Sequence, residues 1–383
     1  MKLRTLDDLE VASKRVLLRA DFNVPLDDGR IADDMRIRAT LPTIREILDR
    51  GATQIIACSH LGRPKGKPDP RFTLAPVGDR LGELLETPIP LTETPTGPVG
   101  PAKIVLLENL RYDRGEEKDD EKFASRLASL ADCYVNDAFG AVHRAHASVH
   151  AVARLLPSAA GRLLEKEVLV LSRILEDPDR PFVAVIGGAK VADKLPVLRN
   201  LLAKVDRLAI GGGMCFTFLA AKGLGVGRSL LEADQLDSVR ELIDSSGERL
   251  LLPTDVVVAA EPKPGVAKRQ VSADSIPDDV MGLDIGKETS RAYVDTVRSS
   301  KTVFWNGPMG VFEIDDFAAG TRAVAAAVAL GPAYSVVGGG DSAAALEKFG
   351  YADKVDHLST GGGASMEFLA GDELPGLAPL RVG

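Results

Sequence analysis

Residues 182–190 read Phe-Val-Ala-Val-Ile-Gly-Gly-Ala-Lys, an unbroken apolar run that ends in two glycines and a lysine. A strand that is apolar at every position suits burial on both faces, as in a parallel sheet. Similar runs recur at 16–19, 54–59, 104–107, 133–136, 207–210, 250–252, 302–304 and 334–337. Segments with helical spacing, such as 36–50 and 121–131, lie between these runs. This alternation predicts an α/β protein of strand–helix units with parallel sheets.

The length of 383 residues predicts two domains. A loop-like stretch at 156–161 precedes a segment, 162–175, in which Leu164, Val168, Leu171 and Leu175 fall on one helical face. The proline-containing stretch 177–181 then ends that pattern. We therefore expect a single helix to connect two α/β halves.

Composition and charge narrow the class of protein further. The chain is 45% hydrophobic and 27% charged, with a net charge of −8, which argues against non-specific binding of nucleic acid. Cys58, Cys133 and Cys215 are widely spaced and odd in number, which is typical of reduced thiols in a cytoplasmic protein. We find no signal peptide and no apolar run long enough to span a bilayer, so no membrane partner is expected.

Glycine clusters follow strands in the second half of the chain. They occupy 187–188, 211–213, 338–340 and 361–363. Glycines at the carboxyl end of a strand let backbone N–H groups approach an anion and open a helix toward it. Lys190 and Lys194 are spaced to share one helix face, with an anion between them. Asp341, inside one glycine loop, suits a Mg²⁺ ligand beside phosphates.

A different nucleotide chemistry is also compatible with these loops. Gly338-x-Gly340-x-x-Ala343 formally matches a dinucleotide-binding fingerprint, with Asp356 as the distant acid. Against this, the Asp341 carboxylate would repel a pyrophosphate lying in the same loop. Residues 282–287 are one residue short of a Walker A motif. A dinucleotide-dependent oxidoreductase therefore remains an alternative.

Basic side chains follow four strands of the first half. The basic residues at these strand ends are Arg36, His60, Arg63, Arg111, His143, Arg144 and His146. Asp21 and Asn23 lie beside them, just past the first strand. If the strands are parallel, these groups meet at one sheet edge and form a pocket for a small, multiply anionic molecule. His143, His146 and His150 have a spacing that would also suit zinc, but Arg144 intervenes and no carboxylate or thiolate follows nearby.

Eight segments, in order along essentially the whole chain, resemble the phosphoglycerate kinase family. They are RADFNVP at 19–25, SHLGRP at 59–64, ENLR at 108–111, NDAFGAVHRAH at 136–146, GGAKVADK at 187–194, WNGPMGVFE at 305–313, GGGDS at 338–342 and STGGGAS at 359–365. Two departures from the usual family pattern are Ala20, where Val is usual, and Ser342, where Thr is usual. The second departure keeps the hydroxyl, so we expect no loss of function.

The resemblance implies two Rossmann-like lobes joined by a helix and a hinge. It places a phosphoglycerate-binding lobe at 1–157, an interdomain helix at 158–177, a nucleotide-binding lobe at 178–365 and a tail, 366–383, that packs back on the first lobe. It implies reversible phosphoryl transfer from 1,3-bisphosphoglycerate to ADP, giving 3-phosphoglycerate and ATP in glycolysis. It further implies a cytoplasmic monomer that uses Mg²⁺ and acts by hinge closure, with hinges at the ends of the helix and at 359–363.

The resemblance also assigns residues. For the glycerate ligand it implies Asp21, Phe22, Asn23, Arg36, His60, Leu61, Gly62, Arg63, Arg111 and Arg144. For the nucleotide it implies Lys190, Lys194, Gly211, Gly212, Gly213, Gly282, Asn306, Glu313, Gly339, Gly340, Asp341 and Ser342, with Asp341 on the metal. Arg36, Lys190 and Lys194 would be catalytic by neutralising charge on the transferred group. Another ATP-dependent carboxylate kinase and a non-catalytic nucleotide-binding regulator remain alternatives.

Overall fold

The computed structural model describes residues 1–382. The chain forms two compact units. Unit 1 comprises residues 1–169 together with the C-terminal residues from 373, and unit 2 comprises residues 170–372. Within the described residues, no helix combines the length and the apolar character that a membrane crossing requires.

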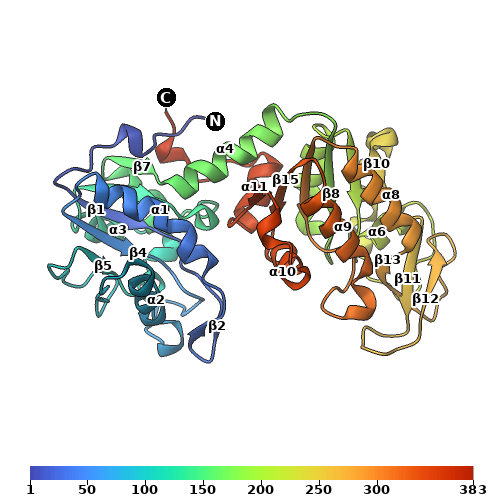
Figure 1. The fold of residues 1–383 in the computed structure, drawn as a ribbon, viewed down its shortest axis with the longest axis horizontal. Coiled ribbons are helices and arrows are strands. Elements are labelled where there is room, and N and C mark those ends of the chain that lie inside the picture. Colours follow the sequence, from blue (N-terminus) through green and yellow to red (C-terminus); the bar gives the residue numbers. More distant parts are fainter. Residues whose placement is uncertain (383) are drawn as a thin grey trace. The chain divides into compact units, whose positions relative to one another are not determined.

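Unit 1 is built on a five-stranded parallel sheet in the order β5-β4-β1-β6-β7. The strands are β1 (Arg15–Arg19), β4 (Gln54–Cys58), β5 (Ile104–Leu106), β6 (Cys133–Asn136) and β7 (Ser158–Ala160) (Figure 1). Four of them lie where unbroken apolar runs predict strands. The parallel arrangement brings all five carboxyl ends to the same edge of the sheet.

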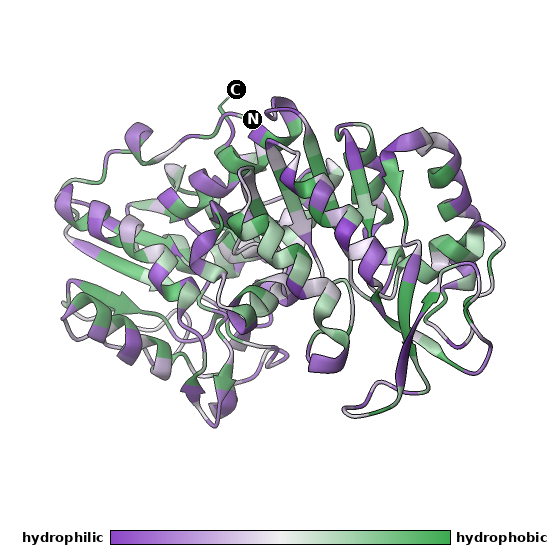
Figure 2. Ribbon diagram, turned by 45° about the vertical axis from the view of Figure 1, so that its right-hand side comes forward, coloured by the Kyte–Doolittle hydropathy of each residue, from purple (hydrophilic) through white to green (hydrophobic). Residues whose placement is uncertain are grey.

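Both faces of this sheet are covered, which explains the unbroken apolar runs. In β1, Val16 and Leu18 pack into one hydrophobic cluster with residues of the helices α1 (Met35–Asp49) and α2 (Ala75–Leu85). Leu17 packs into a second cluster with residues of α3 (Glu121–Ala128). Hydrophobic colour accordingly runs along the sheet strands in Figure 2. Burial of each large aliphatic side chain stabilises the fold by about 1.5–3 kcal/mol.

The remaining regular elements of unit 1 are helices and a small hairpin. They are α1 (Met35–Asp49), α2 (Ala75–Leu85), α3 (Glu121–Ala128), the first part of α4 (Arg162–Glu176) and the hairpin β2 (Leu26–Asp27) with β3 (Arg30–Ile31). The Asp120 carboxylate accepts a hydrogen bond from Phe123 N–H at 2.7 Å and thereby caps α3. A single π-helical turn, η6, spans Ala147–Ala151.

The helix near the middle of the chain lies where the apolar periodicity of 162–175 predicts it, but it begins later than the range 158–177 that the resemblance implies. Residues 158–160 form β7, paired in parallel with β6, and α4 begins at Arg162. The short run Ser-Ala-Ala carries no strand signal of its own. Its burial beside β6 therefore decides its conformation.

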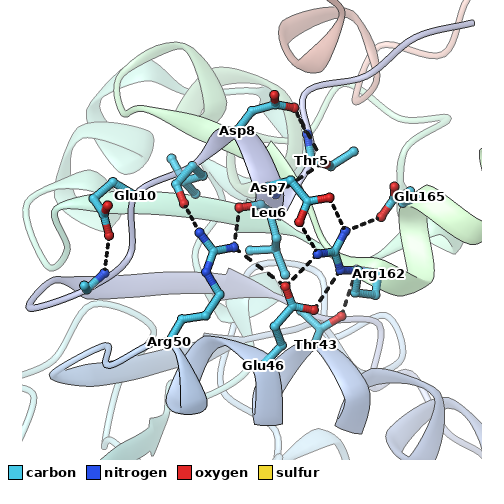
Figure 3. Close-up of polar contacts among 12 residues, drawn as sticks. Thr5, Leu6, Asp7, Asp8, Glu10, Thr43, Glu46, Arg50, Arg162 and Glu165 are labelled. Carbon is cyan, nitrogen blue, oxygen red and sulfur yellow. Dashed lines mark hydrogen bonds and ion pairs between the residues drawn. The ribbon is translucent and has the colours of Figure 1, made fainter.

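Arg162 ties the start of α4 to two other parts of unit 1 (Figure 3). Its guanidinium forms ion pairs with Asp7 at 2.6 Å, Glu46 at 2.6 Å and Glu165 at 2.8 Å, and its backbone N–H donates to Thr43 Oγ1 at 2.9 Å. These hydrogen bonds and charges raise the pKa of Arg162 and lower the pKa of Glu46. The cluster holds α4 against α1 and the N-terminal segment.

We expect Arg162→Ala to lower the free energy of unfolding by about 1 kcal/mol, since the variant loses a network of partly exposed ion pairs. Chemical denaturation of the full chain measures the change. Arg38→Ala, which removes one ion pair between an exposed arginine and the half-buried Asp34, serves as the control and should cost less than about 0.5 kcal/mol. Equal costs for the two variants would mean that the network adds nothing beyond a single pair.

Unit 2 contains a six-stranded parallel sheet in the order β10-β9-β8-β14-β15-β16. The strands are β8 (Phe182–Ile186), β9 (Arg207–Ile210), β10 (Leu250–Leu251), β14 (Thr302–Asn306), β15 (Tyr334–Gly338) and β16 (His357–Leu358). All but β16 coincide with predicted strands. The fold class, α/β with a parallel sheet in each half, is therefore confirmed.

Helices cover this sheet, and a second sheet extends the unit. The helices are α5 (Leu195–Leu202), α6 (Cys215–Ala221), α7 (Leu236–Ser246), α8 (Lys287–Arg298), α9 (Ala319–Leu330), α10 (Gly340–Phe349) and α11 (Gly363–Ala370). The second sheet is antiparallel, in the order β12-β11-β13, from β11 (Asp255–Ala259), β12 (Lys268–Ser272) and β13 (Met281–Ile285). None of these three strands was predicted from the sequence. In β12 every residue is exposed or half-buried, so no apolar run marks it.

The C-terminal tail returns to unit 1. Arg4 N–H donates to Leu380 O at 2.8 Å, and Leu3 pairs with Arg381 in an antiparallel bridge. The returning segment begins at residue 373 and not at 366, because residues up to 372 belong to unit 2. Within unit 2, α11 packs against α5, and Asn200 Nδ2 donates to Leu369 O at 2.6 Å.

Candidate active site

The carboxyl edge of the unit 1 sheet collects the predicted basic groups. Asp21 and Asn23 follow β1, His60 follows β4 and Arg111 follows β5 in a short helical turn. Because these strands are parallel, the loops that follow them lie at one edge. The expectation that the strand ends meet is confirmed for these residues.

Arg36 is held by the loop that follows β1. Its Nη1 donates to the Asp21 carboxylate at 2.9 Å and to the backbone oxygen of Asn23 at 3.3 Å. Asp21 is buried, with 5% of its side chain exposed, whereas 29% of the Arg36 side chain is exposed. Within the described residues, Nε and Nη2 of Arg36 make no hydrogen bond to protein. One edge of the guanidinium is therefore anchored and the rest can bind a ligand.

Gly62 joins the loops after β1, β4 and β5. Its N–H donates to Asn23 Oδ1 at 2.9 Å, and its carbonyl accepts from Arg111 Nη1 at 2.7 Å. The backbone has φ of +59°, and a Cβ at this position would lie 2.3 Å from the Phe72 ring. A side chain would therefore displace the loop that orients Arg111.

The arginine and histidine side chains at this sheet edge lie close enough to shift one another's pKa values. Burial lowers the pKa of His60 well below its usual range, and the charges of Arg19, Arg111 and Arg36 lower it further. Burial and the same arginine-rich surroundings lower the pKa of His146 to about 3. Burial also lowers the pKa of Arg111, although the charge of Glu117, whose Oε1 lies 3.4 Å from Arg111 Nε, opposes the shift. Such a surplus of positive charge indicates a place for an anion.

Other predicted glycerate residues differ in exposure. Arg63 and Arg144 are exposed, and Arg144 Nε donates to His143 Nε2 at 3.2 Å rather than to a carboxylate. The side chains of Phe22 and Leu61 are buried in the hydrophobic core, so only their backbone could face a ligand.

The zinc alternative is wrong for this fold. Among residues 1–382 there is no group of three or more His, Cys, Asp or Glu side chains that could hold a metal. His150 Nδ1 lies 2.5 Å from Asp119, and His146 lies 3.9 Å from Glu116. The π-helical turn at 147–151 separates the histidines that a regular helix would align.

In unit 2, Lys194 lies at the carboxyl edge of the parallel sheet. Its ammonium group donates to Asn306 Oδ1 at 2.7 Å and to the backbone oxygen of Gly187. Asn306 Nδ2 donates in turn to Gly338 O at 2.8 Å, so three strand ends are linked. Desolvation lowers the pKa of Lys194 to about 8, although the Asp341 charge opposes the shift.

The expectation that Lys190 and Lys194 share a helix face is wrong. Lys190 is exposed in the loop after β8, and Lys194 ends a short 3₁₀ turn, while α5 begins only at Leu195. Pro196 in the first turn favours this start, because proline lacks the N–H that a preceding helical turn would use.

The loop after β15 forms a helix N-terminus. Gly339 adopts φ of +92°, and a Cβ there would lie 2.7 Å from Asn306 Nδ2, so glycine is required. α10 begins at Gly340, where a Cβ would meet nothing within 4 Å. Ser342 Oγ is buried and accepts from Gly307 N–H at 2.6 Å, while Asp341 is exposed in the first turn. This end of α10 offers free N–H groups to an anion.

A cavity of about 330 Å³ lies beside these loops. Its lining includes Gly188, Gly212, Gly213, Phe216, Leu230, Met281, Gly282, Val311, Glu313 and Asp341. The Phe216 ring packs so closely that a Cβ on Gly282 would lie 1.9 Å from it. Gly211 is not part of this lining, because it packs against Met309. A mainly apolar pocket with a carboxylate and a helix N-terminus at its mouth suits a nucleotide.

The position of Asp356 rules out the interpretation of the glycine loop as a dinucleotide-binding site. Its carboxylate accepts from Ser335 N–H at 2.8 Å and from Ser335 Oγ at 2.9 Å, near the beginning of β15. Gly338 ends the same strand, so the acid lies toward the opposite edge of the sheet from the glycines. It cannot reach a ribose bound at the glycine loop.

Several buried residues that support the unit 1 site were not predicted from the sequence to have a role there. Arg19, Ser59, Asn109, Glu116 and Ser148 are all buried and hydrogen-bonded around it. Arg19 and Asn109 lie inside quoted motifs, so those motifs were the available signal. Glu116 and Ser148 join the site only through contacts between distant segments.

Comparison with known proteins agrees with this geometry. The family model described as "Phosphoglycerate kinase" matches residues 6–372. The chain belongs to the phosphoglycerate kinase family. The phosphoglycerate kinase of Rubrobacter xylanophilus is 54% identical over 387 residues, covering 99% of this chain and 98% of that protein. The phosphoglycerate kinase of Moorella thermoacetica is also 54% identical, covering 98% of each chain.

Solved structures give the same result. The phosphoglycerate kinase of Coxiella burnetii matches with a TM-score of 0.91 at 42% identity, covering 99% of both chains. That of Pyrococcus horikoshii matches with a TM-score of 0.87 at 34% identity, covering 99% of this chain and 98% of the other. As a phosphoglycerate kinase family member, the chain is a phosphotransferase with a carboxyl acceptor, uses ATP and ADP and acts on small molecules in glycolysis.

Proposed function

We propose that unit 1 binds 3-phosphoglycerate or 1,3-bisphosphoglycerate, that unit 2 binds ADP or ATP, and that the protein transfers a phosphoryl group between them. The observation that carries the proposal for unit 1 is the surplus of arginine and neutral histidine around His60 and Arg111 at one sheet edge. For unit 2 it is the cavity beside the N-terminus of α10.

For the glycerate ligand we assign two kinds of residue. Arg36, Arg63, Arg111 and Arg144 supply guanidinium forks that match carboxylate and phosphate oxygens. Asp21 and Asn23 orient Arg36 and can accept from the glycerate hydroxyl. His60 donates from a neutral ring, while Phe22, Leu61 and Gly62 shape the loops through their backbone.

We assign the nucleotide to the cavity in unit 2 and to the residues at its rim. Gly212, Gly213 and Gly282 leave room for the base, and Gly211 supports them by close packing on Met309. Glu313 lies where it can accept from a ribose hydroxyl. The phosphates are assigned to Lys190, Lys194, Asn306, Gly339, Gly340 and Ser342 at the strand ends and the start of α10.

The residues present fit a Mg²⁺ ion that arrives with the nucleotide. Asp341 is an exposed carboxylate on the cavity rim, and one or two carboxylates plus phosphate oxygens are what Mg²⁺ ordinarily takes. When bound, the ion would neutralise charge on the phosphate oxygens. Asp341 is the residue that would hold it.

The transferred group carries spread negative charge in the transition state, so the protein's task is positioning and neutralisation. Arg36, Lys190 and Lys194 supply the positive charge. The acceptor carboxylate is already ionised at neutral pH, so the reaction needs no general base. Since the two ligands are assigned to different units, we infer that hinge closure brings them together, with hinges at the ends of α4 and at 359–363. Scattering profiles that stay unchanged with both ligands added would contradict closure.

The direct test is Mg²⁺- and ATP-dependent phosphorylation of 3-phosphoglycerate, coupled to reductive removal of the acyl phosphate by a dehydrogenase and NADH. Turnover with 3-phosphoglycerate supports the assignment. Turnover only with another carboxylate would favour a different carboxylate kinase. ATP binding without any turnover would favour a regulatory nucleotide-binding protein.

We expect the affinity for ADP to fall as pH rises through about 8. The pKa of Lys194 in the free protein is lowered to about 8, so the ammonium charge facing the phosphates is lost above that pH. Titration calorimetry from pH 7 to pH 9 measures the effect, with Lys194→Met expected to show weaker but pH-independent binding. A Kd that is flat over this range in the unaltered protein and is also unchanged by Lys194→Met would rule out Lys194 as a phosphate ligand.

We expect Asp341→Asn to raise the Mg²⁺ concentration needed for half-maximal activity at least about tenfold, because a neutral amide is a weaker ligand for Mg²⁺ than a carboxylate. The measurement is turnover against Mg²⁺ at fixed ATP. Asp353→Asn, which changes an exposed carboxylate in the same unit, should leave the Mg²⁺ dependence unchanged. Identical Mg²⁺ curves for the two variants would remove Asp341 as the ligand.

We further propose that the protein acts as a monomer in the cytoplasm. Its three cysteines are unpaired and buried, which supports a reducing compartment. The net charge of −8 supports the absence of a nucleic-acid partner.

A further inference from the structure

A chain of buried hydrogen bonds in unit 1 begins at Glu116. Glu116, Ser148 and Arg19 have no exposed surface. Ser148 Oγ donates to Glu116 Oε1 at 2.6 Å, and Ser148 N–H donates to Glu116 Oε2 at 3.0 Å. Both carboxylate oxygens therefore accept from the same residue, in the π-helical turn at 147–151.

Arg19 continues the chain to His60. Its Nε donates to Ser148 Oγ at 2.9 Å, and its Nη2 lies 3.0 Å from His60 Nδ1. Because a guanidinium can only donate, Nδ1 of His60 must accept. The single proton of a neutral ring is then on Nε2, and the second ring nitrogen is the one left for a ligand.

The surroundings keep this ring neutral. A second proton on Nδ1 would meet the Arg19 guanidinium directly. Burial and the nearby charges of Arg19 and Arg111 lower the pKa of His60 well below its usual range. Burial raises the pKa of Glu116, while Arg19 and the two hydrogen bonds from Ser148 favour its ionised form. Glu116 accepts both hydrogen bonds from Ser148, and Ser148 Oγ accepts from Arg19, so the three side chains form one buried hydrogen-bonded unit.

We propose that Glu116 and Ser148 are positioning residues which, through Arg19, fix His60 as the Nε2–H tautomer, so that the ring donates to an oxygen of the anionic glycerate ligand. The inference rests on the proposed glycerate site. With the other tautomer, the ring would turn a lone pair toward an anion and repel it. A residue that only stabilised the fold would have no effect on the tautomer.

The tautomer can be read in the ligand-free protein. The chain has five histidines, so a long-range ¹H–¹⁵N spectrum of histidine-labelled protein is tractable, and His60→Gln assigns the His60 signals. We expect a protonated Nε2 and an unprotonated Nδ1. A ring protonated on Nδ1, or on both nitrogens, at pH 7 would overturn the inference without any variant and without any assay of function.

Ser148→Ala removes the hydroxyl that joins Glu116 to Arg19. We expect a mixture of His60 tautomers and a KM for 3-phosphoglycerate that rises about threefold to tenfold, the range of one neutral hydrogen bond, with the KM for ATP unchanged. Ser158→Ala is the matched control, because Ser158 is buried in the same unit and its hydroxyl donates only to backbone carbonyls of Ala153 and Leu156.

The outcomes separate the inference from the proposed function. An unchanged tautomer, or an unchanged KM for 3-phosphoglycerate, in Ser148→Ala would overturn the positioning role. Equal effects in Ser148→Ala and Ser158→Ala would also overturn it. Absence of turnover with 3-phosphoglycerate in the unaltered protein would instead overturn the proposed glycerate site, whatever the spectrum shows.

Discussion

Replacing Arg36 by alanine is expected to lower kcat about a thousandfold while the protein stays folded. Arg36 is anchored through Nη1 to Asp21 and to the Asn23 carbonyl, and its remaining donors have no hydrogen-bond partner among the described residues. A preorganised guanidinium aimed at a transferred phosphoryl group is worth about 10³-fold or more in phosphotransferases. Single-turnover and steady-state rates with 3-phosphoglycerate and ATP measure the loss.

The pattern of kinetic constants distinguishes this role from simple substrate binding. If Arg36 acts mainly on the transition state, kcat and kcat/KM fall together. If KM alone rises, Arg36 is a binding residue and the catalytic assignment is wrong. Arg45→Ala is the matched control, since Arg45 is an exposed arginine on the same helix. It should leave both constants within about twofold, as expected of a surface substitution.

Replacing Lys194 by methionine is expected to abolish activity and to stabilise unit 2 at the same time. Desolvation lowers the pKa of Lys194 from 10.5 to about 8, so at pH 7 the folded state holds an unfavourably desolvated charge. Methionine removes that cost but leaves the Gly187 carbonyl and Asn306 Oδ1 without their donor. We expect the free energy of unfolding to increase by about 1–2 kcal/mol in Lys194→Met and the Tm to rise by a few degrees.

The pH dependence of this gain provides the check. The folded pKa lies below the unfolded one, so the cost is complete below about pH 8 and disappears as pH rises toward 10.5. The stability difference between Lys194→Met and the unaltered protein should therefore shrink between pH 7 and pH 10. Lys204→Met, at an exposed lysine of the same unit, should show no such trend. A variant that is less stable at pH 7 would mean that the hydrogen bonds of Lys194 outweigh its desolvation.

Much of the candidate site could be predicted because its residues follow strands. Asp21 and His60 each lie just beyond an apolar run, and parallel pairing alone brings such positions together. In unit 2, Asn306 and Gly338 likewise end the neighbouring parallel strands β14 and β15, although Asn306 was assigned to the site only through the resemblance. What failed was local helix geometry. Lys190 and Lys194 have helical spacing, but Pro196 moves the start of α5 beyond both of them.

Apolar runs in the sequence placed most strands of the two parallel sheets, and with them the polar groups that follow those strands. An apolar run is a property of adjacent residues, and the carboxyl ends of parallel strands share one edge whatever the strand order. Contacts between distant segments set the strand order β5-β4-β1-β6-β7, the antiparallel sheet of 255–285 and the partners of buried charges. Glu116 reaches Arg19 through Ser148, and Lys194 meets Asn306, because a buried charge needs compensating groups and only folding brings such distant segments together.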